Sequence, residues 1–265
     1  MHLSVSQIKT FSSDPLGWIM HYIEGIKLPP TEALYFGKDF ATAIECCINR
    51  QTMEEGLSPV AVGLAEKWYK RNQMDMEMYP WESEHKFRIA LAEGLPEFIG
   101  AIDICCVKDN ILHLYDYKTA SFSWDRKTFW GLETKTDLRK DYQLSLYVHS
   151  MLQEHPEIET IMIGHHQIIK VKEKGQIIDY FFRTVKTDTT EKKVKNVLTK
   201  IIKCAKMIVE VRELYNKDGF DGILKYYGVN RLTELTENYQ YGRPNPFWNF
   251  YIGRETLEDL KKRIN

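Results

Sequence analysis

Cysteine is scarce in this sequence, and its few copies form no metal-binding pattern. Only five of the 265 residues are cysteine; they occur as the adjacent pairs Cys46/Cys47 and Cys105/Cys106 and as the single Cys204. No C-x-x-C spacing occurs, which argues against a zinc ribbon or finger, and an odd number of cysteines cannot all pair as disulfides. We therefore expect reduced cysteines that are mostly buried as small apolar side chains.

Long hydrophobic runs are missing too. No apolar stretch approaches the ~20 residues that a membrane-spanning helix needs. The N-terminal sequence MHLSVSQIKTF also lacks the charged and then apolar pattern of a signal peptide. No Pro/Gly-rich or long polar tract marks a disordered tail. These absences predict a cytoplasmic protein that is ordered nearly throughout and has no membrane partner.

An excess of positive charge is lacking as well. Lysine and arginine number 36, aspartate and glutamate 37, and the formal net charge is -1. Proteins that only coat nucleic acid often carry an overall positive field, so the balance counts mildly against that class. It counts less against an enzyme, because carboxylates clustered around a divalent cation offset basic residues that bind phosphates elsewhere.

Hydrophobic patterning along the chain predicts an α/β fold. Helical segments are expected at 4–24, 37–50, 137–154 and 190–215. Strands are expected at 87–91, 98–107, 111–118, 158–171 and 176–185. The first three strands should form a meander, and the last two a hairpin that turns at 173–175. Because neither a repeat nor a linker is visible, we expect one domain over 1–265, with a helical and aromatic extension from about residue 190.

The segment at 100–120, GAIDICCVKDNILHLYDYKTA, is the most informative. Asp109 and Asn110 tolerate positive φ and suit a two-residue hairpin turn. With that turn, the numbers of directly opposed residues sum to 219, which places Asp103 opposite Asp116. The register of this hairpin therefore predicts that two carboxylates meet across two neighbouring strands.

Opposed carboxylates need a compensating charge. Directly opposed Cβ atoms lie ~4.5 to 5.5 Å apart, where like charges destabilise a sheet. A divalent cation such as Mg²⁺ or Mn²⁺ would compensate Asp103 and Asp116. Lys118 shares a strand face with Asp116, so its ammonium could position water or stabilise a charged phosphorane. The alternative is a solvated hairpin in which Asp116 merely pairs with Lys118, but the apolar neighbours of both aspartates favour a sheet interior.

Further motifs surround this hairpin in a fixed order. They are LSVSQIKTFSSDP at 3–15, GKDFATAIE at 37–45, Glu84, GAID at 100–103, DYKT at 116–119 and QLSLY at 143–147. In this order and spacing they resemble the PD-(D/E)XK nuclease superfamily, specifically its RecB-type and phage exonuclease branch, over about 3–147. The resemblance implies a restriction-endonuclease-like αβββαβ core, with a central mixed sheet flanked by helices.

The resemblance also implies roles for individual residues. Asp103 and Asp116 would bind Mg²⁺ or Mn²⁺, and the carbonyl of Tyr117 would be a further ligand. Lys118 would orient or activate the attacking water. Glu84 would support the site or a second metal.

Two departures from the branch's pattern are visible. Ala41 stands where many members carry a metal-binding histidine, so one expected ligand is absent. Asp14-Pro15 stands where iron-sulfur members carry Cys-Pro, and no cysteine follows Cys204, so we expect no iron-sulfur cluster.

Two groups of residues are candidates for contacting DNA. Gln143 and Tyr147 lie four apart on a helix and could hold the DNA backbone or brace the site, with ordinary helix packing as the alternative. The segment before them interleaves basic and aromatic side chains, which suits a strand with neutralised phosphates and stacked bases. Its candidate residues are Trp124, Arg126, Lys127 and Trp130. The alternative for the two tryptophans is that they anchor a long loop to the core.

Other features are interpreted as structural. These are His165-His166 inside a strand, the turn at 243–246, and the C-terminal aromatic residues, which include Trp248 and Tyr251.

The sequence thus predicts a metal-dependent DNA exonuclease for recombination, repair or phage DNA processing in a bacterial or phage-infected cell. A single-strand annealing or recombination protein and further copies of the chain are candidate partners. One alternative is an impaired DNA-end-binding protein of the same fold, suggested by Ala41. Another is a hydrolase of a different phosphate ester.

Overall fold

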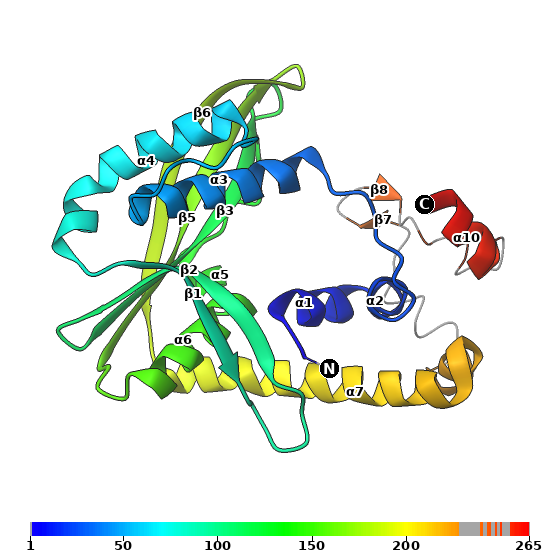
Figure 1. Cartoon of the computed structure of the whole chain (residues 1–265). Helices are drawn as coiled ribbons and strands as arrows, with labels where there is room; N and C mark the ends of the chain where they lie inside the picture. Colours follow the sequence, from blue (N-terminus) through cyan, green and yellow to red (C-terminus); the bar gives the residue numbers. More distant parts are fainter. Residues whose placement is uncertain are drawn as a thin grey trace. The chain divides into compact units, whose positions relative to one another are not determined.

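The computed structural model describes residues 2–227, 239–240, 243–244, 247, 250 and 255–264 (Figure 1). The chain forms two compact units. The first contains Met1–Pro29, Ala90–Phe98 and Thr199–Asn265, and the second Pro30–Ile89 and Ile99–Leu198. The single domain expected from the sequence stays a prediction.

A mixed β-sheet lies at the centre of the second unit. Its strands are β1 (Glu82–Ile89), β2 (Phe98–Lys108), β3 (Ile111–Ser123), β4 (Thr128–Trp130), β5 (Thr160–Glu173) and β6 (Gln176–Thr189). The order is β1-β2-β3-β5-β6, and β4 pairs with β3 off this path. The pairs β2–β3, β3–β4 and β5–β6 are antiparallel, whereas β3 and β5 are parallel. A parallel pair needs a long crossover, which here contains helix α6 (Tyr142–Glu154).

Helices α3 (Glu32–Ile48) and α4 (Pro59–Met78) lie side by side against the sheet (Figure 1). Their apolar residues, among them Phe40 and Trp68, form one buried cluster with Tyr115 of β3 and Ile168 of β5. Side chains alternate along a strand, so the residue after Tyr115 points to the opposite face. The sheet therefore has an aromatic face toward α3 and α4 and a second face that carries Asp116. The order α3, β1, β2, β3, α6, β5 is the predicted αβββαβ core.

The predicted helix over 4–24 is wrong, because the chain breaks within it. Helix α1 (Val5–Ser13) ends at Asp14, and α2 (Pro15–Tyr22) begins directly after it. Proline has no N–H for an earlier carbonyl, but it fits the first position of a helix. The Asp14 carboxylate accepts a hydrogen bond from the Gly17 N–H at 2.7 Å and caps α2. Asp14-Pro15 is therefore a boundary between two helices.

Several other predicted bounds also change. Helix α3 begins at Glu32 rather than near residue 37, and α4 was not predicted at all. The expected helix over 137–154 is divided into α5 (Lys135–Leu138) and α6, whose N-cap is Asp141. β1 begins five residues earlier than expected and β3 ends five residues later. The expected long loop after β3 contains β4, so β3 and β4 form a hairpin.

Helix α7 (Glu191–Tyr227) continues past residue 215, where the sequence predicted its end, and is interrupted four residues later. Gly219 has φ 67° and ψ -163°, a conformation that is essentially restricted to glycine, and the helix continues beyond it. The remaining described elements are β7 (Tyr239–Gln240), β8 (Arg243–Pro244) and α10 (Leu257–Ile264). Trp248, Tyr251 and half of the predicted turn at 243–246 lie outside the described residues.

The cysteines are placed as the sequence predicted. All five are free; Cys46, Cys105 and Cys106 are buried, and Cys47 and Cys204 are half-buried. Within the described ranges, no helix is both long and apolar enough to cross a membrane.

Candidate active site

The β2–β3 hairpin has the predicted turn and register. Asp109 and Asn110 have φ values of 51° and 60°, as a type I′ turn requires. The observed pairs run from the turn to Ile104 opposite Tyr115, so their numbers sum to 219 throughout. One further step along both strands reaches Asp103 and Asp116.

Asp103 is held against the neighbouring strand. One of its carboxylate oxygens accepts a hydrogen bond from the Tyr117 N–H at 2.8 Å. Burial and the nearby Asp116 carboxylate raise the pKa of Asp103 well above its ordinary value, although the Tyr117 hydrogen bond opposes this. The pair is thus costly to ionise without a compensating cation.

Asp116 is the centre of a polar network. It is 1% exposed, and its Oδ2 lies 2.5 Å from the Lys118 Nζ. Gln143 of α6 donates from Nε2 to Asp116 Oδ1 at 2.8 Å, and its Oε1 accepts from Lys118 Nζ at 3.0 Å. Gln143 Nε2 also donates to the Tyr147 hydroxyl at 2.7 Å. One glutamine side chain therefore bridges the aspartate, the lysine and the tyrosine.

The network favours a charged lysine. Burial opposes the ammonium of Lys118, but the charge and hydrogen bonding of Asp116 outweigh it and raise the pKa of Lys118. Burial, followed by the charge of Asp116, raises the pKa of Tyr147, so its hydroxyl keeps its proton. Lys118 thus acts here as a cation and hydrogen-bond donor.

Two glutamates add negative charge to the same region. Glu84 in β1 has a φ of 53°, unusual for a residue other than glycine. Burial, then repulsion by Glu45 of α3, raises the pKa of Glu84, and Asp116 acts in the same direction. Glu45 was noted in the sequence only as part of the helix motif and was not predicted as a site residue. Carboxylates from α3, β1, β2 and β3 thus interact electrostatically.

The donor set fits a divalent cation. Hard cations bind carboxylate oxygens, and Asp103 and Asp116 offer them from neighbouring strands, while Glu84 and Glu45 add negative charge to the region. Asp116 Oδ2 is buried, and the Lys118 ammonium is the one cationic partner that the described part of the chain places within 3 Å of it. Ala41 lies one turn before Glu45 on the same helix face, and its methyl group offers no ligand atom.

His165 and His166 have different surroundings although they are adjacent. His166 packs on the aromatic face, with its ring centroid 4.9 Å from that of Trp68, and its Nδ1 is hydrogen-bonded to Thr184 Oγ1 at 2.9 Å. His165 pairs with Asp116 in the parallel β3–β5 ladder. Its Nε2 lies 3.9 Å from Asp116 Oδ2. The contacts of His166 fit the structural interpretation of this pair, and for His165 that interpretation stays a prediction.

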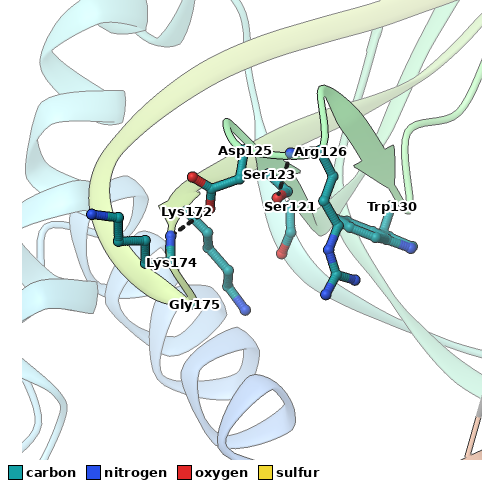
Figure 2. Close-up of a pocket in the computed structure, with 8 residues that line it drawn as sticks. All are labelled: Ser121, Ser123, Asp125, Arg126, Trp130, Lys172, Lys174 and Gly175. Carbon is teal, nitrogen blue, oxygen red and sulfur yellow. Dashed lines mark hydrogen bonds between the residues drawn. The ribbon is translucent and has the colours of Figure 1, made fainter.

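The β3–β4 hairpin lies farther along β3 and borders a pocket of about 730 Å³ (Figure 2). Its lining includes Arg126, Trp130, Lys172 and Lys174. Figure 2 shows the Arg126 and Lys172 side chains extending in a similar direction. Trp124 and Trp130 are 60% and 50% exposed, so the alternative that they anchor the segment to the core is wrong.

Two solved structures show a distant similarity to this chain. A candidate exonuclease of known structure from Eubacterium rectale is similar, with 14% identity, a TM-score of 0.44 and coverage of 75% of this chain and 76% of that chain. The structure of SSO0001 is similar with 16% identity, a TM-score of 0.27 and coverage of 68% and 81% respectively. No curated protein matches the sequence.

The family model for the PD-(D/E)XK nuclease superfamily matches residues 2–219, which include both strands of the β2–β3 hairpin and the QLSLY motif of α6. Nucleases of this superfamily are phosphodiester hydrolases and typically use a divalent metal. The chain belongs to the PD-(D/E)XK nuclease superfamily.

Proposed function

We propose that this protein is a metal-dependent deoxyribonuclease, and specifically an exonuclease that acts on DNA ends. The observation that carries the proposal is the buried pair Asp103 and Asp116 with the Lys118 ammonium beside it. Their carboxylates would hold Mg²⁺ or Mn²⁺, together with the Tyr117 carbonyl and with Glu84 in support. The cation would supply Lewis-acid polarisation of a phosphate oxygen and lower the pKa of a bound water.

The protein's own residues would position the reacting groups. Lys118 is charged and would stabilise the negative charge that develops on the phosphate. Gln143 contacts both Asp116 and Lys118, so it would fix the distance between the carboxylate and the ammonium. Tyr147 is hydrogen-bonded to Gln143 and would brace that amide from α6.

The experiment that tests this function compares linear duplex, circular duplex and single-stranded DNA with Mg²⁺, Mn²⁺ or a chelator. We expect metal-dependent loss of linear DNA only, and Asp116→Asn or Lys118→Met should abolish it. Asp109→Asn is the matched control, because it removes a carboxylate from the same hairpin at a turn position that asparagine tolerates. Cutting of circular duplex would contradict the exonuclease assignment, and activity in Asp116→Asn would contradict the site.

We further propose that the β3–β4 hairpin and its pocket bind the DNA strand. Strands rise about 3.3 Å per residue, so the pocket residue Ser121 lies about 10 Å beyond Lys118 along β3. Arg126 and Lys127 would neutralise phosphates of a strand that passes the end of β3, while Trp124 and Trp130 would stack on bases.

The DNA-binding proposal is tested with Arg126→Ala/Lys127→Ala. This double variant should bind DNA more weakly. In a plot of the logarithm of the binding constant against the logarithm of the salt concentration, its slope should be smaller in magnitude by about one to two. The matched control is Lys192→Ala/Lys193→Ala, since these lysines are exposed near the start of α7. An unchanged slope in Arg126→Ala/Lys127→Ala would rule out phosphate contacts by this pair.

A second candidate function rests on Ala41. A protein that lacks one metal ligand could bind DNA ends without cutting them. Ala41→His would restore an imidazole one turn before Glu45 and should raise Mn²⁺-dependent cleavage. Unchanged or lower activity would refute the missing-ligand interpretation, whereas binding without cleavage in every variant would favour the end-binding protein.

A further inference from the structure

We propose that His165, Glu133 and Asp141 form a second cation site beside the proposed catalytic pair, and that this site takes Mn²⁺ or Zn²⁺ in preference to Mg²⁺. The cation there would position Asp116 and helix α6 and would not contact the DNA. None of the three residues belongs to the motifs that identify the superfamily.

The three residues meet from separate parts of the second unit. His165 lies in β5, Glu133 precedes α5, and Asp141 is the N-cap of α6. One potential ligand atom of each lies within 4.8 Å of the other two. Ligand atoms bound at about 2.1 Å to one ion are at most about 4.2 Å apart. Closing the site around a cation thus needs only a sub-ångström movement.

The buried imidazole points to a missing ligand. His165 is 0% exposed, and neither of its ring nitrogens has a hydrogen bond within the ranges that the structure describes. Its Nδ1 lies 2.8 Å from Glu133 Oε2, but without hydrogen-bond geometry. Buried polar groups are rarely left unsatisfied. A cation that binds Nδ1 and the Glu133 carboxylate as neighbouring ligands, each at about 2.1 Å, would satisfy the imidazole.

Such a cation would also determine what the other ring nitrogen does. With Nδ1 bound to metal, the neutral ring carries its proton on Nε2, which lies 3.9 Å from Asp116 Oδ2. A small approach would let Nε2–H donate to Asp116, an arrangement that orients ligands in many metal sites. His165 would thereby connect the new site to Asp116.

Asp141 connects the site to the other side of the catalytic network. Its Oδ1 accepts hydrogen bonds from the N–H groups of Gln143 and Leu144, at 2.6 and 2.9 Å, at the start of α6. Gln143 in turn contacts both Asp116 and Lys118. Binding of Asp141 to a cation held by β5 would therefore fix α6 at the residues that position the catalytic pair.

The ligand types select the metal. One imidazole nitrogen with two carboxylates suits Mn²⁺ or Zn²⁺, whereas Mg²⁺ prefers oxygen ligands and keeps its waters. Asp103 and Asp116 offer oxygen only. Excess Mg²⁺ should thus fill the catalytic pair and leave the His165 site for Mn²⁺.

The test measures binding of Mn²⁺ to the full chain in excess Mg²⁺, by equilibrium dialysis and by electron spin-echo spectroscopy. All measurements are made in an Asp103→Asn background, which removes a ligand of the proposed catalytic cation. Mn²⁺ binding at the His165 site is then measured whether or not the proposed catalytic function is correct. We expect one bound Mn²⁺ per chain, with a nitrogen modulation from imidazole. His165→Gln should abolish the modulation and weaken binding at least ten-fold.

Glu133→Gln provides a second variant, because this side chain is 32% exposed and its replacement is compatible with folding. It should also weaken Mn²⁺ binding at least ten-fold while the circular dichroism spectrum stays unchanged. The control is Glu157→Gln, which removes a carboxylate that pairs with the more exposed His155. Absence of bound Mn²⁺, a bound ion without nitrogen modulation, or unchanged affinity in Glu133→Gln would each overturn the proposal.

Discussion

The buried imidazole of His166 makes the stability of the sheet depend on pH. It lies on the aromatic face of the sheet, where its ring centroid is 4.6 Å from the ring centroid of Tyr115. Burial, followed by the charges of His165 and Lys186, lowers the pKa of His166 to about 3, whereas an unfolded histidine has a pKa of about 6.5. Between these values the unfolded chain takes up a proton that the folded chain does not. The free energy of unfolding must therefore fall as the pH drops below about 6.5.

The size of the effect follows from these two pKa values. At about pH 7.5 both states are neutral at this residue. At about pH 5 the unfolded histidine is almost fully protonated, which lowers the free energy of unfolding by about 2 kcal/mol. His166→Gln removes the titration, and its amide can still be hydrogen-bonded to Thr184. Urea unfolding of both proteins at several pH values between these limits measures the difference.

The change in the free energy of unfolding with pH is the informative quantity. Glutamine also packs differently from histidine, but that contribution to the free energy of unfolding does not depend on pH. Over this range the parent protein should lose about 2 kcal/mol more than His166→Gln. His155→Gln replaces a more exposed histidine and should keep the slope of the parent. Equal slopes for the parent and His166→Gln would refute the reasoning.

Three further predictions concern the site and its support. Gly164→Ala places a Cβ 2.7 Å from both the Val185 carbonyl oxygen and the Tyr115 ring, so calorimetry should show a loss of about 1 to 3 kcal/mol; an unchanged melting temperature would contradict this. Asp103→Asn removes one of two repelling carboxylates and should raise the melting temperature of the metal-free protein while abolishing cleavage. Gln143→Ala frees the network around Asp116, and kcat should fall by up to about 10²-fold with little change in KM; a change in KM alone would indicate a role in DNA binding instead.

The β2–β3 hairpin could be predicted from the sequence because its determinants are local. Asp109 and Asn110 fix the turn, and a two-residue turn fixes every pair along both strands, including the step to Asp103 and Asp116. Helix α4 also has a local signal that the prediction missed. Pro59 begins it, and Ala61, Leu64, Ala65 and Trp68 recur at helical spacing.

The position of His165 could not be predicted in the same way. Its neighbour Asp116 lies on a parallel strand, and no short turn connects the two strands or sets their register. The alternation rule shows only that His165 and His166 face opposite sides of the sheet. Which of them faces Asp116 depends on how β5 is placed by its crossover. Glu45 is a similar case, since α3 and β1 meet only in the folded chain.

The length of β3 has a consequence for how this family member can vary. The same uninterrupted strand contains Asp116 and Lys118 and then Ser121 and Ser123 of the pocket. Side chains alternate along the strand, so Ser121 and Ser123 point to the face opposite that of Asp116 and Lys118. Insertion of one residue between these pairs would bring the pocket side chains to the face of Asp116, whereas two residues would keep them on their own face and move the pocket by about 7 Å. The spacing between the catalytic pair and the pocket can therefore change without altering the face of either only by insertions or deletions of two residues. In related proteins, the distance along this strand between the pocket and the proposed catalytic residues should change in steps of about 7 Å.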